Sequence, residues 1–322
     1  MKKVAILLLV TIIDSVGLAE RVTVDYHVVN DLGVPVKNAK VTTWTEKNSI
    51  IQSWYSSAEY DDYIRKTNGA GDARCTFGCH NGDFQALVEA EGHYPVQMSM
   101  QSFRTDYDFA TKSTKFFEKK KQLNITLFRK INPVPMNSYL GNMRWIQFLT
   151  NTWNNCGYDL QLHDWLPPNG HGKVADLYVS HEATIEGDIL YSHGHISFDD
   201  KCGGYIVKSK REDKKLLVYS ADTNANYVTS FIAERKKRIN KEVLEQQQIL
   251  GEGEALVMRT RVKTDSQGNI ISCRYSKIYG PFSAAGVFKF KQSSYNPEDG
   301  STNLEFDVRS NLSKSPWFGF IP

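Results

Sequence analysis

Short runs in which apolar and polar residues alternate are the feature of this chain that most limits its fold. In RVTVDYHVV, Val22, Val24, Tyr26 and Val28 occupy every second position. A period of two places such residues on one face of a β-strand. The run stops at NDLG, whose residues are typical of a tight turn. Because similar runs recur along the chain, the sequence predicts a mainly β protein with many short strands.

The first third of the chain repeats this pattern several times. Every second residue is apolar or β-branched in three further runs: Val41, Thr43 and Thr45; Ala86, Val88 and Ala90; Leu123, Ile125 and Leu127. Asn68-Gly69 and Asn81-Gly82 supply turns between them. Gly92 ends a strand at a position where we expect an unusual backbone angle.

Length and composition predict two domains. The chain has 322 residues, of which 41% are hydrophobic and 12% aromatic. That is more chain than one core usually organises. We expect a front domain over residues 20–130, a linker over 131–143 and a larger β-rich domain over 144–322. Pro133 and Pro135 suit a stiff linker because they hold the chain extended and remove two amide donors.

The first nineteen residues have the pattern of an export signal. Lys2 and Lys3 precede an apolar run from Val4 to Ile13, which is too short to span a bilayer. Small residues before residue 20 fit cleavage after Ala19. The sequence therefore predicts a signal peptide over 1–19, no transmembrane segment, and a periplasmic, cell-surface or extracellular location. The formal net charge of +3 gives no reason to expect nucleic acid as a partner.

Five cysteines would meet an oxidising compartment after export. They are Cys75, Cys79, Cys156, Cys202 and Cys273. Cys75 and Cys79 precede His80, but zinc knuckles need a second ligand pair at a matching spacing. In an extended strand these two cysteines would lie about 13 Å apart, so a disulfide between them requires a turn at Gly78. A disulfide and two buried thiols both remain open, and we expect fewer than five free thiols.

The front region resembles the carboxypeptidase regulatory-like domain. The pieces DLGVPVKNAKV, TNGAGDARC, LVEAEGHYPVQ and LNITLFR carry the resemblance, which covers about residues 21–130. It implies an immunoglobulin-like or prealbumin-like β-sandwich that acts as a spacer, stabiliser or adhesion unit. Such a domain supplies no activity by itself.

The larger region also reads as strands. The stretch EALVMRTRVKTDSQGNIISCRYSKIYG predicts a hairpin with its loop at residues 265–269. Its alternation places Ala255, Val257, Arg259 and Arg261 opposite Leu256, Met258 and Val262. Residues 225–250 break the pattern. Here the rough helical spacing of Val228, Phe231, Ile232, Arg235 and Ile239 predicts a short helix, the only one expected in the chain, followed by an exposed excursion.

A second resemblance spans nearly the whole chain after residue 19. INPVPM, GYDLQLHDWLPPNGHGKVADLYVS and YNPEDGSTNLEFDVRSNL are similar to segments of a group of exported bacterial proteins that carry the regulatory-like domain in front. This resemblance implies the two-domain arrangement. It implies no activity.

The stretch YSHGHISFDDKCGG at residues 191–204 is the strongest candidate for a metal site. In a strand, His193 and His195 share one face, as a metal requires. A site also needs a third and usually a fourth ligand, and any half-buried strand places polar residues at this spacing. We therefore interpret the stretch as a solvated polar face. His193, His195 and Asp199 remain the metal-ligand candidates.

No catalytic motif stands out in the sequence. It contains no G-x-S-x-G elbow, no H-E-x-x-H helix and no Gly-rich phosphate loop. The leading hypothesis is therefore an exported, non-catalytic β-protein without a cofactor that binds a glycan or an extracellular protein. The rival is a secreted hydrolase or metalloprotein that uses polar residues around 171–200.

Aromatic residues near expected loops are the candidates for ligand binding. Trp54, Tyr55 and Tyr60 lie in an insertion of the front domain, and Trp165 stands beside Pro167-Pro168. Exposed rings offer flat apolar faces to sugars or peptide side chains. Packing of Trp165 over the core is the alternative interpretation.

Overall fold

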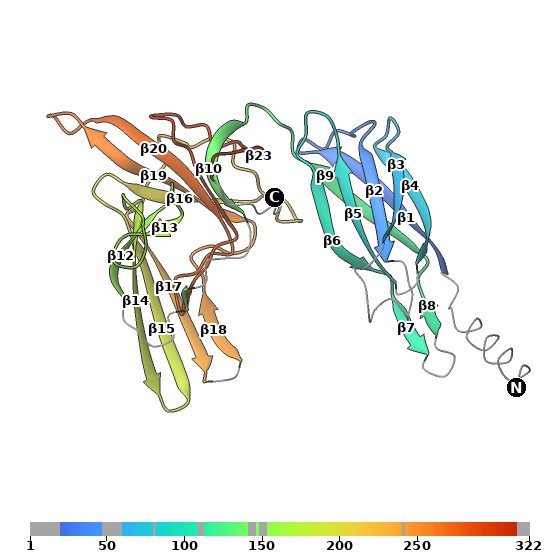
Figure 1. The fold of residues 1–322 in the computed structure, drawn as a ribbon, viewed down its shortest axis with the longest axis horizontal. Coiled ribbons are helices and arrows are strands. Elements are labelled where there is room, and N and C mark those ends of the chain that lie inside the picture. The colour runs from blue at the N-terminus through green and yellow to red at the C-terminus, as the bar shows by residue number, and fades with distance from the viewer. Residues whose placement is uncertain are drawn as a thin grey trace, which may run out of the picture. The chain divides into compact units, whose positions relative to one another are not determined.

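The computed structural model describes residues 20–46, 60–79, 82–108, 113–140, 146–147, 153–239 and 242–313. The chain divides into two compact units at Lys130 and Ile131 (Figure 1). All regular elements in the described ranges are strands, which confirms the mainly β fold. The predicted signal peptide lies outside these ranges. Within them, no helix has the length and hydropathy needed to cross a membrane.

The first unit is a sandwich of two sheets. Its strands are β1 (Glu20–Asn30), β2 (Lys40–Glu46), β3 (Tyr60–Lys66), β4 (Asp72–Cys79), β5 (Asp83–Glu89), β6 (Val96–Ser102), β7 (Thr105–Asp108), β8 (Ser113–Phe116) and β9 (Lys120–Leu127). One sheet has the order β4-β1-β9 and the other β3-β2-β5-β6, while β7 and β8 form a separate hairpin. β1 pairs antiparallel with β4 and parallel with β9.

The core of the first unit follows the predicted alternation. Val22, Val24, Tyr26 and Val28 of β1 are all buried. The Tyr26 hydroxyl and the Thr43 hydroxyl lie 2.7 Å apart and join the two sheets by a hydrogen bond. Gly92 has a φ of 69°, so the unusual backbone angle expected there is confirmed.

The second unit contains the remaining strands. They are β10 (Val134–Leu140), β11 (Ile146–Gln147), β12 (Trp153–Asp159), β13 (Asp164–Trp165), β14 (Leu177–Glu186), β15 (Ile189–Ser197), β16 (Gly203–Lys208), β17 (Ser230–Arg238), β18 (Val243–Gln247), β19 (Glu254–Thr264), β20 (Ile270–Tyr279), β21 (Val287–Phe288), β22 (Gln292–Tyr295) and β23 (Phe306–Asn311). One six-stranded sheet has the order β13-β12-β14-β15-β17-β18, and we call it the arm sheet. The other, with the order β16-β19-β20-β22-β10-β23, is called the facing sheet.

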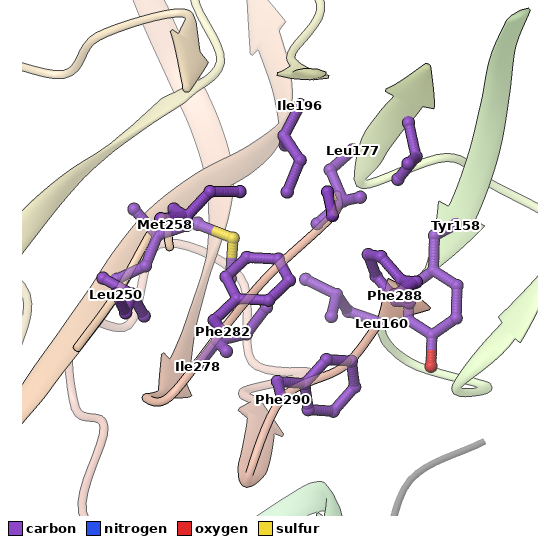
Figure 2. Close-up of a cluster of buried hydrophobic side chains, with 14 of the residues drawn as sticks. Tyr158, Leu160, Leu177, Ile196, Leu250, Met258, Ile278, Phe282, Phe288 and Phe290 are labelled. Atoms are coloured by element: carbon purple, nitrogen blue, oxygen red, sulfur yellow. The ribbon is translucent and has the colours of Figure 1, made fainter. Parts of the chain in front are cut away.

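The two sheets of the second unit share a hydrophobic core. Leu177 and Ile196 of the arm sheet pack in one cluster with Met258 and Ile278 of the facing sheet. Figure 2 shows these side chains around Phe282. A second cluster, which includes Val218 and Leu304, covers the other face of the facing sheet. The face of the arm sheet that points to the shared core is called its inner face, and the opposite one its outer face.

Two expectations from the sequence are wrong. The expected linker over 131–143 contains β10, which pairs with β22 and β23 inside the facing sheet. Residues 225–250 hold β17 and β18 instead of a helix. Phe231 and Ala233 of β17 are at least partly buried while Ile232 between them is 56% exposed. This is the alternation of a strand, and the helical spacing was coincidental.

Candidate functional site

Residues 191–197 of the histidine-rich stretch belong to β15, which lies between β14 and β17 in the arm sheet. His193 stands opposite Glu182 of β14 and Glu234 of β17, and His195 stands opposite Ser180 and Ile232. Both histidines are exposed on the outer face, as the strand period predicts.

No metal site is formed by these residues. His193 Nδ1 lies 3.6 Å from Glu234 Oε1, and both side chains are more than half exposed. Asp199 follows β15 and accepts a hydrogen bond of 3.3 Å from the Tyr178 hydroxyl. Among the residues that the structure describes, no group of three His, Cys, Asp or Glu side chains could hold a metal ion.

Gly194, between the two histidines, has a packing role. It lies on the inner face and is buried. A Cβ at this position would overlap the carbonyl of Ala284 and lie 2.7 Å from the backbone nitrogen of Ala285. The His-Gly-His sequence therefore reflects the close passage of another backbone segment below β15. The sequence alone offered no signal for this contact, because residues 284 and 285 are distant in the chain.

The outer face of the arm sheet forms a continuous exposed surface. His195 is beside Ile232, which is 56% exposed. Four residues before His195, Tyr191 is partly exposed on the same face, and the ammonium of Lys236 lies 5.7 Å from the centre of its ring. This face thus combines an apolar side chain, an aromatic ring and hydrogen-bonding imidazoles on rigid strands.

The aromatic binding candidates do not gather into a site. Trp54 and Tyr55 lie outside the described residues. Tyr60 begins β3, and its side chain also lies outside them. Trp165 is only 2% exposed, and its ring packs 4.9 Å from that of Phe288. The binding prediction for Trp165 is therefore wrong, since its ring belongs to the core.

Two of the acidic residues between 159 and 188 form an ion-pair cluster with Arg261, and two lie at the surface. Arg261 donates to Asp159 and Asp176, with both nitrogen–oxygen distances 2.9 Å. It also donates to the Gln161 side chain over 2.6 Å. Glu182 and Asp188 are exposed on the arm sheet and its turn. The two buried carboxylates are thus tied to Arg261.

Burial and hydrogen bonds act in opposite directions on the two carboxyl groups. Burial raises the pKa of Asp176 despite the hydrogen bonds from Arg261. Burial alone would also raise the pKa of Asp159, but backbone N–H groups of residues 162, 173 and 174 and the charge of Arg261 hold that pKa below its usual value. A low pKa is expected for a carboxylate that, like Asp159, accepts several backbone hydrogen bonds from one loop.

All five cysteines are free thiols in the structure. Cys75 and Cys79 are buried at 0% exposure along β4, so their strand does not turn at Gly78. The interpretation as two buried thiols is confirmed, and the expectation of fewer than five free thiols is wrong for this structure. Cys156 is the more accessible thiol, with intermediate exposure.

No family model and no curated protein matches the chain. A 3-chlorocatechol 1,2-dioxygenase from Rhodococcus opacus is 11% identical with a TM-score of 0.25, and the match covers 34% of this chain and 60% of the dioxygenase. A Bacteroides fragilis protein, described as membrane-associated and of unknown function, is 10% identical with a TM-score of 0.18 over 88% of this chain and 99% of its own. Likenesses this weak carry no argument about function.

Proposed function

We propose that this chain is an exported, non-catalytic β-protein that binds a glycan or an extracellular protein through the outer face of its arm sheet. The observation that carries the proposal is the exposure of Ile232 on that face, beside His195, with Tyr191 on the same face four residues before His195 in β15. An apolar side chain among aromatic and hydrogen-bonding groups is typical of interface centres. Its position on paired strands keeps it ordered before binding.

The first unit is proposed to act as a spacer or adhesion module of the carboxypeptidase regulatory-like type. The sequence pieces quoted above and the two-sheet sandwich support this assignment. Export rests on Lys2, Lys3 and the apolar run that follows them, together with the small residues before residue 20.

A ligand screen with surface variants tests the proposed binding face. Glycans and extracellular proteins are presented to the full chain and to a Tyr191→Ser, Ile232→Ser double variant. We expect at least one ligand whose affinity falls about ten-fold or more in the variant, because exposed apolar anchors dominate binding energy. Ile271→Ser is the matched control, since Ile271 of β20 is 65% exposed in the same unit. A ligand that binds all three proteins equally would contradict the assignment of this face, provided that circular dichroism shows the variants folded.

A further inference from the structure

The cations on the two faces of β17 differ in whether they form ion pairs. On the outer face, Lys236 lies 3.7 Å from Glu245, and Arg238 lies 3.2 Å from Asp188 and 3.3 Å from Glu242. On the inner face, Arg235 and Lys237 form no ion pair with any of the described residues. Both side chains are nonetheless half-buried.

Arg235 packs against the turn at Gly286 and has a buried donor without a partner among the described residues. Its Nε is buried and has no hydrogen-bond partner within the described part of the chain. The same holds for the Nε of Arg238 on the outer face, but Arg238 is ion-paired and, among these residues, Arg235 is not. A Cβ placed on Gly286 would lie 3.1 Å from its Nη1, so the guanidinium lies over that turn. Buried donors are nearly always satisfied in proteins. The half-buried guanidinium therefore keeps donors for a carboxylate that the described residues do not supply.

Aliphatic side chains lie beside Lys237 on the inner face. Lys237 is paired in register with Leu190, which is paired with Ile185. Ile185 is 54% exposed and Leu244 of β18 is 37% exposed. Figure 1 shows β14, β15 and β18 running together beyond the strands of the facing sheet. The inner face therefore offers two cations beside an apolar patch.

We propose that the inner face of the arm sheet binds an extended peptide segment of a partner protein that carries two carboxylate side chains two residues apart, flanked by aliphatic residues. Arg235 and Lys237 are themselves two residues apart, so their Cα atoms are separated by about 6.5–7 Å. Carboxylates at alternate positions of an extended peptide repeat at the same spacing. The guanidinium would donate two hydrogen bonds to one carboxylate, and the aliphatic residues of the peptide would cover Ile185 and Leu190.

The inner face is a second surface of the arm sheet. The proposal for it rests on the proposed binding function only in that both assign ligand binding to this sheet. The variants of the outer face leave Arg235 and Lys237 in place. A failed glycan and protein screen on the outer face is therefore distinguishable from a failed peptide test on the inner face.

Two capped synthetic peptides test the proposal on the full chain. One has glutamates at two alternate central positions with leucines outside them, and the other has glutamines instead. We expect the glutamate peptide to bind, and the Arg235→Gln, Lys237→Gln variant to weaken it about ten-fold or more, because each lost partner leaves a carboxylate unpaired. The Lys236→Gln, Arg238→Gln variant removes the same charge from the outer face and is expected to bind normally. Lys237→Gln alone is the second variant if Arg235→Gln disturbs folding.

Several results would overturn the inference. Equal weakening by the inner and outer variants would mean attraction by net charge alone. Equal binding of the glutamine peptide would remove the role of the carboxylates, and no binding of the glutamate peptide would remove the site. Binding of a uronate oligosaccharide or of inorganic phosphate, lost in the inner variant while the peptide does not compete, would assign the cations to another anion.

Discussion

The Arg261 guanidinium meets the Asp176 carboxylate side-on. Its Nε donates to Oδ1 and its Nη2 donates to Oδ2, each over 2.9 Å. The same Nη2 also donates to Asp159, whose other oxygen accepts the N–H groups of Lys173 and Val174. One side chain from β19 thereby fixes both ends of the segment between β12 and β14.

Replacing Arg261 by lysine is expected to destabilise the second unit by about 2–4 kcal/mol, because a single ammonium cannot serve two buried carboxylates in this geometry. The measurement is urea unfolding of the second unit. Arg211→Lys is the control, since Arg211 pairs with Asp213 two residues away near the surface. An equal loss of stability from both changes would show that the Arg261 cluster stabilises the second unit no more than a surface ion pair does.

The hairpin that carries Arg261 was predictable from the sequence, but the cluster was not. Strict alternation places Arg261 on the same face as Val257 and Arg259. In the structure the pairing of β19 with β20 shifts between Thr260 and Lys263, and Arg261 has a φ of 50°. This bulge adds one residue to β19 and redirects the following side chains. A bulge at a non-glycine residue leaves no clear mark on the sequence.

Trp165 and β17 also show where prediction from the local sequence fails. The prolines after Trp165 correctly indicated a loop, yet the ring turns into the core because β13 pairs with β12. For β17, the residue pattern fits a helix and a strand about equally well over one or two turns. Only its pairing with β15 and β18 decides between them. Strand pairing settled both cases, and local propensity could not.

The partly exposed Cys156 is expected to be the fast-reacting thiol of the native protein. Cys75 and Cys79 are 0% exposed, while Cys202 and Cys273 are below 10%. Burial raises the pKa of the Cys156 thiol, against a weak hydrogen bond from Asn169. Its labelling rate should therefore rise with pH through the usual thiol range and beyond, because only the thiolate reacts.

Labelling with a chromogenic disulfide reagent measures this difference. One thiol should react rapidly in the native protein and five after denaturation without reductant. Cys156→Ser should remove the fast phase and leave the slow ones. Two or more fast thiols, or fewer than five after denaturation, would show that the cysteines are arranged differently.

Gly194→Ala is expected to destabilise the second unit by about 1–3 kcal/mol, because the new methyl group meets backbone atoms that cannot move independently. Gly251→Ala is the matched control. The nearest atom to a Cβ at Gly251 is 3.6 Å away, so that change should be nearly neutral or slightly stabilising. His193→Ala and His195→Ala should change stability by less than about 0.5 kcal/mol, as exposed residues do. Thermal unfolding of the four variants measures these changes. A loss of stability in Gly194→Ala as small as in the other three would refute the packing role of Gly194.

Lys277 is the most deeply buried cation among the described residues. Its side chain is 1% exposed on β20, and its Nζ donates to the carbonyl of Val218 over 3.0 Å. Burial lowers the pKa of Lys277 to about 7, although the nearby Glu305 acts in the opposite direction. In the unfolded chain the pKa returns to the ordinary value of about 10.4.

The pH dependence of stability follows from this difference. Between about pH 7 and pH 10 the unfolded chain holds a proton on Lys277 that the folded chain has lost, so this residue makes stability rise with pH; below about pH 7 its cost is constant. Lys277→Met removes the slope. Above pH 7, the free energy of unfolding of the wild type should therefore rise relative to that of the variant by up to about 1.4 kcal/mol per pH unit. Urea unfolding from about pH 6 to about pH 9 measures this difference. Lys208→Met is the control, because Lys208 is 73% exposed and pairs with Glu254 at the surface. Parallel curves for the wild type and Lys277→Met would show that Lys277 keeps its proton when folded.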